Sequence, residues 1–227
     1  MSVIEVKNLH KIYKETKIPV YAVNGIDISF QEGEFTAVVG PSGSGKTTFL
    51  NMVGGLDEPT EGDVIIDGKS ISGMKSGKLI DFRLHNIGFV FQAFNLIPVL
   101  TAIENVSFIM QLQGWSKKKR KQRAKEVLEN VGIGDKLDNK PGNLSGGQQQ
   151  RVAVARALAP RPKFILADEP TANLDSKATS ELLDIMQKMN KESNITFIFA
   201  THDQRVMDKA RRIVTIDDGK VSSDISK

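Results

Sequence analysis

The 227-residue chain contains no cysteine, which excludes disulfide bonds and metal sites built on thiolates. It has no stretch approaching about 18 uninterrupted apolar residues, so we expect no segment to span a membrane. The N-terminal segment MSVIEVKNLH is charged and patterned like a strand, so it does not resemble a signal peptide. Internal repeats and low-complexity linkers are also missing from the sequence. Stability must therefore come from an ordinary packed core.

Composition and charge are close to the average for soluble globular proteins. Hydrophobic residues make up 40% of the chain and charged residues 26%. The formal net charge of +4 is mild and does not by itself indicate nucleic-acid binding. The length fits one large domain, or one domain with an inserted subdomain, that buries most of its potential core surface.

The most informative segment is GPSGSGKT, from Gly40 to Thr47. It fits the pattern of a phosphate-binding P-loop, in which four residues separate a glycine from Gly-Lys-Ser/Thr. A Gly/Ser-rich surface turn is the plain alternative. The context argues against it, because an apolar β-run at Phe35–Val39 precedes the loop and a helix-compatible segment at Lys46–Val53 follows. This order of strand, glycine loop and helix predicts a nucleoside triphosphate site.

The residue types of the loop explain its chemistry. Gly40, Gly43 and Gly45 permit backbone angles that turn successive N–H groups toward one point. The helix that follows adds the positive end of its dipole. Lys46 can reach the terminal phosphates, and the Thr47 hydroxyl can bind Mg²⁺.

Strand-like and helix-like patterns alternate along the chain. Strands are predicted at Ser2–Leu9, Val23–Phe30, Phe35–Val39, Gly62–Gly68, Ile87–Phe91, Phe164–Ala167, Ile195–Ala200 and Ile213–Ile216. Helices are predicted at Lys46–Val53, Ala102–Gln113, Lys117–Asn130, Gly146–Ala159, Lys177–Lys191 and Asp203–Ala210. The alternation predicts a largely parallel sheet covered on both faces, and the helical middle of the chain is interpreted as an insertion into it.

A second motif, ILADE, is an apolar run that ends in the two acids Asp168 and Glu169. A buried strand here would deliver both acids at its C-terminal end, where open α/β sheets bind their ligands. Asp168 can hold Mg²⁺ through water, and Glu169 can accept a proton from an attacking water. A surface turn after the strand is the alternative, and the P-loop in the same chain makes it the weaker interpretation.

A third motif is LSGGQQQR, from Leu144 to Arg151. Ser145 and Gln148 have the spacing of a capping box, which predicts a helix start. Capping does not account for Gly146 and Gly147, because glycine in a helix costs on the order of 1 kcal/mol relative to alanine. Two residues without side chains at a positive helix end would let a phosphate approach the backbone.

In this order, GPSGSGKT, LSGGQQQR and ILADEP resemble the ATP-binding-cassette (ABC) ATPases over nearly the whole chain, and LSGGQ is the signature of that family. The resemblance implies an α/β fold with a P-loop NTPase (RecA-like) core and a largely parallel sheet. An N-terminal antiparallel β subdomain and an inserted α-helical subdomain complete it. It also implies a single ABC ATPase domain over residues 1–227, with the nucleotide-binding core at 1–92 and 160–227 and the helical subdomain, which carries the signature, at 93–159.

The resemblance assigns roles to further residues. Gln92 matches the Q-loop glutamine that links Mg²⁺ to the helical subdomain, and Asn173–Asp175 resembles the D-loop. His202 matches the switch histidine, and Tyr13 has the place of an aromatic residue that stacks on adenine. Plain alternatives are a strand-end aromatic for Tyr13, a structural histidine for His202 and a surface amide for Gln92.

The residues implied to act fall into four sets. The catalytic residues are Lys46, Glu169 and His202. The residues implied to bind ATP within one chain are Tyr13, Gly40, Ser42, Gly43, Ser44, Gly45, Lys46, Thr47, Thr48 and Gln92. The residues implied to hold the metal are Thr47, Gln92 and Asp168. The residues implied to contact ATP across a dimer are Ser145, Gly146, Gly147, Gln148 and Asp175.

The resemblance implies that two cassettes pack head to tail as an isologous homodimer, so that ATP on one P-loop meets the signature of the other copy. Closure then depends on the γ-phosphate, which hydrolysis removes. The chain is therefore expected to be a Mg²⁺-dependent, transport-coupled ATPase. Glu169 would polarise the water, His202 would hold the γ-phosphate, and Lys46 with Mg²⁺ would offset the developing charge.

Because no membrane span is expected, the resemblance implies a separate integral membrane permease subunit as partner. Its coupling helix would dock beside the Q-loop, in the stretch Phe91–Leu100. Phe94, Leu96 and Ile97 in that stretch contact the partner or, alternatively, cover the core of the helical subdomain. An ATP-dependent site without an export signal implies a cytoplasmic protein that is peripheral on the inner face of the cell membrane.

Several linking segments resemble the macrolide-efflux and lipoprotein-release type (MacB/LolD-like): GGLDEPTEGDVIIDG, IGFVFQAFNLIPVLTAIENV and LADEPTANLDSKA. Cell-division and peptide-antibiotic-resistance cassettes have close patterns. The expected function is to power export, lipoprotein release or mechanotransmission. The alternatives are a soluble ABC ATPase that acts on nucleic acid or ribosomes, and a module that uses ATP only as a switch.

Lys117–Arg123, with the sequence KKKRKQR, is the one strong charge run. A solvated helix start is the usual explanation, and contact with anionic lipid or with an acidic loop of a partner is the alternative. No nucleic-acid partner is expected, because no aromatic residues interleave with these charges.

Overall fold

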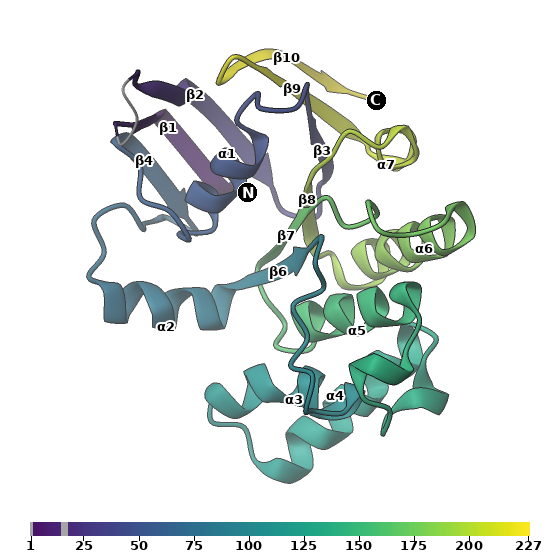
Figure 1. The fold of residues 1–227 in the computed structure, drawn as a ribbon. Helices are drawn as coiled ribbons and strands as arrows, with labels where there is room; N and C mark the ends of the chain where they lie inside the picture. The colour runs from purple at the N-terminus through teal and green to yellow at the C-terminus, as the bar shows by residue number, and fades with distance from the viewer. Residues whose placement is uncertain (1, 15–17) are drawn as a thin grey trace.

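The computed structural model describes residues 2–14 and 18–227, which form two β-sheets and a set of helices (Figure 1). The antiparallel sheet has the strand order β2-β1-β4-β5 and consists of β1 (Ser2–Tyr13), β2 (Val20–Gln31), β4 (Glu61–Ile66) and β5 (Lys69–Ser70). The larger sheet has the order β10-β9-β3-β8-β7-β6 and consists of β3 (Phe35–Val39), β6 (Ile87–Phe91), β7 (Phe164–Asp168), β8 (Thr196–Ala200), β9 (Arg212–Asp217) and β10 (Lys220–Ser226). Its neighbouring strands are parallel except for β9 and β10. The predicted α/β fold, with a largely parallel sheet and an N-terminal antiparallel one, is confirmed.

The helices follow the chain between the strands. They are α1 (Lys46–Val53), α2 (Ser76–Asn86), α3 (Ala102–Leu112), α4 (Lys117–Asn130), α5 (Gly146–Leu158), α6 (Ser176–Ser193) and α7 (Gln204–Lys209). Two short 3₁₀ segments, Gly134–Lys136 and Pro141–Asn143, lie between α4 and α5. In the described part of the chain no helix has the length and apolar character needed to cross a membrane.

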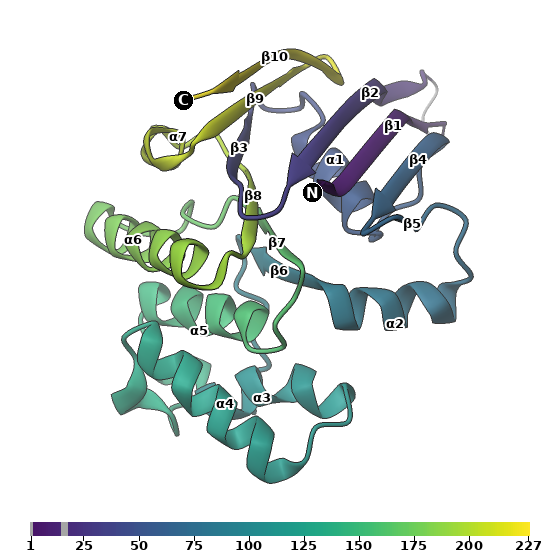
Figure 2. The ribbon, with the colours of Figure 1, turned by 180° about the vertical axis from the view of Figure 1, so that it is seen from behind.

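The inner strands of the larger sheet are apolar because both of their faces are buried. In β8, Phe197 and Phe199 face a core shared with α3, α4, α5 and α6. Ile198 and Ala200 of the same strand face a second core, shared with α1 and the antiparallel sheet. Consequently α1 lies between the two sheets (Figure 2).

Between β6 and β7 the chain leaves the larger sheet and forms α3, α4 and α5, which pack against one another (Figure 1). α3 begins with a capping box in which Thr101 and Glu104 satisfy each other's backbone N–H groups. On α4 the basic residues are exposed or half-buried, and Ala124, Val127 and Leu128 face the core. The charge run is thus the solvent side of an amphipathic helix.

The helix α2, the strand β10 and the two-residue strand β5 had no predicted counterpart. No residue of α2 is fully buried, and only partly buried side chains such as Leu79 and Phe82 pack against the core, so the apolar pattern of this helix is weak in the sequence. β10 has the polar sequence KVSSDIS and pairs only with β9 at the edge of the sheet. The predicted strand Gly62–Gly68 ends at Ile66, because Asp67 and Gly68 turn with positive φ angles.

Candidate nucleotide-binding site

The loop between β3 and α1 has a backbone that its glycines alone permit. Gly40 has φ 147°, and a Cβ atom there would lie 2.0 Å from the carbonyl oxygen of Ile216. Gly45 has φ 102°, and a Cβ atom there would lie 2.0 Å from the carbonyl oxygen of Ala22. Strands β9 and β2 lie directly against these two positions. The conformation of the loop is therefore fixed both by the backbone angles of its glycines and by its contacts with neighbouring strands.

Two polar groups of this loop are suited to an anion. Lys46 is 8% exposed, and its Nζ donates to the carbonyl oxygens of Gly40 at 2.9 Å and Pro41 at 2.8 Å. The side chain therefore stays curled over the loop. Ser44 Oγ is buried, and within the described part of the chain it has no hydrogen-bond partner. A phosphate oxygen would supply the acceptor that this hydroxyl lacks, so the loop fits a phosphate.

Hard oxygen donors meet where α1 approaches β7. The Thr47 hydroxyl donates to Asp168 Oδ1 at 3.0 Å. Burial, more than the repulsion from Glu169, raises the pKa of Asp168 above its ordinary value, although Thr47 and Lys46 act in the opposite direction. A hydroxyl and a carboxylate are donors that Mg²⁺ prefers, and the residues present therefore fit that ion.

Glu169 follows β7 in an unusual conformation. Its φ is 46°, and its N–H donates to the carbonyl oxygen of Ala200 at 2.9 Å, so it continues the sheet while its side chain turns toward the cavity. Oε1 lies 2.7 Å from His202 Nδ1, and Oε2 accepts from Thr201 Oγ1 at 3.2 Å. The His202 side chain is 75% exposed and that of Glu169 only 17%, so packing holds the carboxylate while the imidazole is held mainly by its contact with Glu169.

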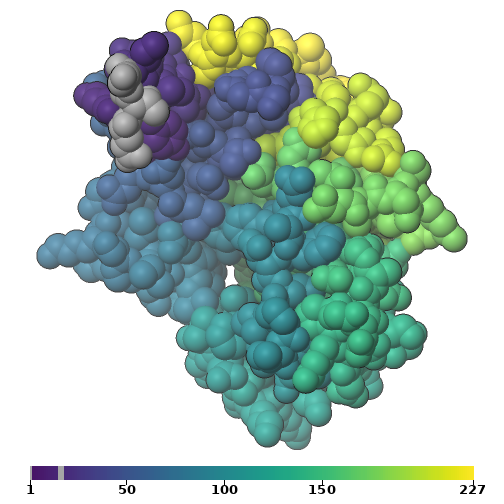
Figure 3. Space-filling view, in the orientation of Figure 1, coloured from purple at the N-terminus to yellow at the C-terminus, as the bar shows by residue number. Residues whose placement is uncertain are grey.

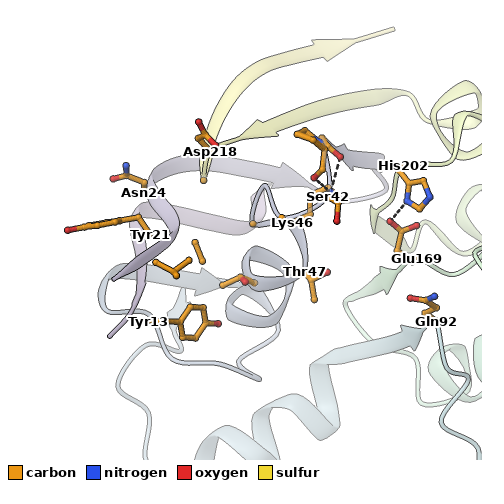
Figure 4. Close-up of a pocket in the computed structure, with 18 residues that line it drawn as sticks. Tyr13, Tyr21, Asn24, Ser42, Lys46, Thr47, Gln92, Glu169, His202 and Asp218 are labelled. Atoms are coloured by element: carbon orange, nitrogen blue, oxygen red, sulfur yellow. Dashed lines mark hydrogen bonds and ion pairs between the residues drawn. The ribbon is translucent and has the colours of Figure 1, made fainter. Parts of the chain in front are cut away.

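A cavity of about 1100 Å³ runs along the P-loop. Tyr13 lies at one end of it, and Gln92, Glu169 and His202 lie at the other (Figure 4). The predicted residues that line the cavity are Tyr13, Gly40, Ser42, Gly43, Gly45, Lys46, Thr47, Thr48, Gln92, Glu169 and His202. Ser44 and Asp168 lie behind this wall. The segment Ser145–Gln148 and Asp175 are not part of the lining.

Sequence reasoning missed one wall of the cavity. It is formed by β2 and by the turn between β9 and β10, through Val20, Tyr21, Ala22, Asn24, Asp218 and Gly219. Gly219 N donates to the carbonyl oxygen of Ser44 at 3.1 Å, and its own carbonyl accepts from Asn24 N at 2.8 Å. Asp218-Gly219 is a hairpin-turn signal that could have revealed the turn, but nothing in the sequence places that turn against the P-loop.

The signature segment has a local role in this chain. Ser145 caps α5: its Oγ accepts from Gln148 N at 3.3 Å, and its N donates to Gln148 Oε1 at 2.9 Å. A Cβ atom on Gly147 would lie 3.1 Å from the Ala178 Cβ of α6, so this glycine permits close helix packing. A Cβ atom on Gly146 would make only ordinary contacts of 3.7 and 3.8 Å. Packing within the chain therefore explains Gly147 and leaves Gly146 without a structural reason.

Two other predicted residues also have structural contacts. Asp175 caps α6, where its Oδ1 accepts from Ala178 N at 2.8 Å. The Gln92 side chain is in the cavity wall, and the backbone carbonyl oxygen of Gln92 accepts from Asn173 Nδ2 at 2.9 Å. The two loops that resemble the Q-loop and the D-loop are thus joined by this bond.

A second cavity, of about 640 Å³ and largely apolar, lies between α2, β6 and α3. The surface is visibly hollowed between α2 and the helical part of the molecule (Figure 3). Ile97 lines this cavity, Leu96 packs against the core, and the Phe94 ring is near Gly146. The three apolar side chains of this loop therefore have three different surroundings.

Comparisons with known proteins agree with this geometry. The family model described as ABC transporter matches residues 23–172. An ABC transporter ATP-binding protein of Thermotoga maritima is 48% identical over 219 residues, 96% of this chain and 93% of the relative. The macrolide export ATP-binding/permease protein MacB of Aggregatibacter actinomycetemcomitans is 43% identical over 227 residues, which are 100% of this chain and 35% of MacB. The dimeric post-hydrolysis structure of the cassette MJ0796 of Methanocaldococcus jannaschii, bound to ADP and Pi, has a TM-score of 0.91 at 43% identity, with 98% of each chain covered.

Proposed function

This chain belongs to the ABC transporter ATP-binding proteins, and we propose that it hydrolyses ATP with Mg²⁺ to power a separate integral membrane subunit. The observation that carries the proposal is the cavity along the P-loop, with Lys46 at its wall and the pair Glu169–His202 at one end. That cavity supplies a phosphate-binding loop and a fixed carboxylate in one place. A molecule that bound ATP only as a switch would not need the carboxylate.

The chain's own groups divide the work. Bound phosphate oxygens would replace the carbonyl acceptors of Gly40 and Pro41, so that Lys46 extends onto the terminal phosphates. Glu169, oriented by Thr201, accepts a proton from the attacking water, and His202 turns from Glu169 to the γ-phosphate. Mg²⁺, when bound, offsets the charge that develops on the phosphate oxygens.

We assign the remaining ATP contacts in the same way. Tyr13 stacks on adenine, the backbone of the P-loop cradles the phosphates, and Thr47, Asp168 and Gln92 hold the metal directly or through water. Tyr13, Lys46 and Gln92 follow one another in this order along the cavity in Figure 4. The division into a core at 1–92 and 160–227 and a helical subdomain at 93–159 is part of the same proposal.

A second copy of the chain would complete the site. Ser145, Gly146, Gly147, Gln148 and Asp175 lie outside the cavity lining, and the glycine at 146 has no reason within the chain. MJ0796, a cassette with the same fold, forms a dimer with ADP and Pi. We therefore place the signature of each copy on the ATP of the other, in an isologous homodimer.

The apolar cavity between α2 and α3 supports a membrane partner. Two of its apolar side chains, Ile80 and Leu112, are 57% and 55% exposed. Exposing such an apolar surface to water is unfavourable unless a partner covers it. In MacB an ATP-binding part and a permease part share one protein. By analogy we place a helix of a permease subunit in this cavity, which sets the chain on the inner face of the cell membrane, in the cytoplasm.

Export, lipoprotein release or mechanotransmission of the macrolide-efflux type is the finer form of the proposal, supported by the likeness to MacB. The alternative of a soluble ABC ATPase on nucleic acid or ribosomes receives no support from the site. The basic run on α4 remains a solvated face in this account.

ATP turnover tests the first part of the proposal. The purified chain should release phosphate from ATP only when Mg²⁺ is present. Glu169→Gln should lower turnover by about 10²-fold or more, because the proton acceptor is lost, and should leave ATP binding intact. Undiminished hydrolysis in this variant would remove Glu169 from its role.

Co-purification from detergent-solubilised membranes tests the partner. Leu112→Asp places a charge in the apolar cavity, whereas Ile225→Asp alters an apolar residue of β10 that is 59% exposed and outside the cavity. Wild type and Ile225→Asp should retain the same integral membrane protein, identified by mass spectrometry, and Leu112→Asp should lose it at unchanged basal turnover. Equal retention by all three chains would contradict the docking site.

A further inference from the structure

Tyr13 does not stand alone at its end of the cavity. Its hydroxyl donates to Asp57 Oδ2 at 2.7 Å. Lys11 Nζ donates to Asp57 Oδ1 at 2.6 Å and to the carbonyl oxygen of Glu58 at 2.7 Å. The same Nζ lies 5.0 Å from the centroid of the Tyr13 ring, within the range of a cation–π contact. Lys11, Asp57 and Tyr13 are called the Tyr13 anchor below.

The anchor joins strand β1 to the chain that follows α1. Asp57 lies just beyond this helix, and Leu56 N and Asp57 N both donate to the carbonyl oxygen of Asn51, at 2.7 and 3.3 Å. The first residue of the helix, Lys46, belongs to the P-loop. One short helix therefore carries the phosphate loop at its start and the partner of Tyr13 directly after its end.

We propose that Asp57, supported by Lys11, is a positioning residue that fixes the Tyr13 ring relative to the P-loop and thereby sets the affinity for the adenine of ATP. This inference rests on the stacking role proposed above for Tyr13. Neither Asp57 nor Lys11 lines the cavity, so we expect the anchor to act through the Tyr13 ring on the base and not on the phosphates. Its removal leaves the phosphate contacts unchanged.

The physical reason is that stacking depends on the plane and position of the ring. A tyrosine at the end of a strand would lose side-chain rotational freedom when adenine binds, and a ring that is already fixed loses less. The side chains of Lys11 and Asp57 are only 14% and 28% exposed, so their bonds are less weakened by water than those of a surface pair.

The charge state of Asp57 agrees with this role. Burial alone would raise the pKa of Asp57, but the hydrogen bonds from Lys11 and Tyr13 and the charge of Lys11 outweigh it and lower the pKa. Asp57 is therefore ionised near neutral pH and accepts from both neighbours at once. A carboxylate that only closed the loop after α1 would not need the tyrosine hydroxyl.

Affinity measurements on the full chain test the anchor. The variants are Tyr13→Ala, Tyr13→Phe, Asp57→Asn and the double variant Tyr13→Phe/Asp57→Asn. Glu5→Gln, which removes an exposed ion pair with Lys7 on the same strand, is the matched control. Two probes, ATP and inorganic triphosphate, are each titrated with Mg²⁺ by calorimetry. Urea unfolding checks that every variant folds.

Tyr13→Ala should weaken ATP binding the most. Tyr13→Phe and Asp57→Asn should each weaken it by about 3- to 10-fold, as the loss of one hydrogen bond predicts. The losses of the two single variants should be less than additive in the double variant, because both changes act on the same hydrogen bond between Tyr13 and position 57. Inorganic triphosphate should bind all variants alike, and KM for ATP should rise while kcat at saturation stays the same.

The outcomes separate the two proposals. If Tyr13→Ala binds ATP like the wild type, the stacking role of Tyr13 is wrong and the anchor falls with it. If Tyr13→Ala weakens ATP binding while Tyr13→Phe and Asp57→Asn do not, only the anchor is overturned. An equal loss of ATP and triphosphate in Asp57→Asn would likewise overturn it, and Tyr13→Phe decides the matter if Asp57→Asn fails to fold.

Discussion

The P-loop and the signature segment are both glycine-rich starts of helices, yet the chain treats their glycines differently. Gly40 and Gly45 have positive φ angles, and their missing side chains make room for neighbouring carbonyl oxygens 2.0 Å from the Cβ positions. Gly146 is the first residue of α5, is not among the positive-φ glycines of the described chain, and has room for a side chain. The fold itself requires the first pair and does not require the last.

This difference separates what a chain needs for folding from what it needs for a ligand. A glycine that the fold demands has a visible steric cause within the same chain, as Gly45 has in Ala22. A glycine without such a cause, at the positive end of a helix, points to a group outside the chain. In our account that group is the ATP held by the P-loop of a second copy.

The largest effect is expected from a methyl group added to the P-loop. Gly45→Ala combines an unfavourable positive φ with a clash on the Ala22 carbonyl oxygen. We expect a loss of roughly 2–4 kcal/mol in the free energy of unfolding, measured in urea, together with loss of ATP binding. A variant of wild-type stability would show that the loop is not fixed by its neighbours.

A methyl group added to the signature should lower turnover without changing stability. Gly146→Ala should leave the free energy of unfolding within about 1 kcal/mol of the wild type, since the angle is helical and the space is open. ATP binding to the single chain should also be unchanged. Turnover should fall by about 10-fold or more, because the methyl group blocks the close approach of a phosphate. Full turnover in Gly146→Ala would remove the signature backbone from the ATP site.

A smaller effect is expected at the neighbouring glycine. Gly147→Ala should destabilise the chain by about 1 kcal/mol, because the new methyl group would press on Ala178 at 3.1 Å. In a double-mutant cycle measured by urea unfolding, the double variant Gly147→Ala/Ala178→Gly should lose less free energy of unfolding than the sum of the two single variants, because the second change removes the methyl group that the first one meets. Strict additivity of the two changes would show that helix packing does not explain this glycine.

The sequence predicted the parts of the fold that have a local cause. The strand before the P-loop, the buried strand that ends at Asp168 and the cap at Ser145 all follow from periodicity or from short-range hydrogen bonds. Helix α2 had only a weak signal, because Leu79 and Phe82 are only partly buried against the core. An element could be predicted where its buried residues form a regular pattern in the sequence, whatever the length of the element.

The same distinction applies to the candidate site. The P-loop and Glu169 belong to continuous motifs, and they could be found without a structure. The wall formed by Asn24 and Gly219, and the contact of Tyr13 with Asp57, join segments far apart in the chain. Such contacts depend on how the two sheets meet across α1, which no local pattern encodes.

Sedimentation velocity of Glu169→Gln shows whether one ATP is held between two copies of this chain. With saturating ATP and Mg²⁺ the variant should sediment as a dimer, because the unhydrolysed γ-phosphate keeps the two copies together; with ADP it should sediment as single chains. Adding Gly146→Ala should abolish the ATP-dependent dimer. Single chains of Glu169→Gln at saturating ATP, together with wild-type chains that hydrolyse ATP at full rate regardless of protein concentration, would contradict the account.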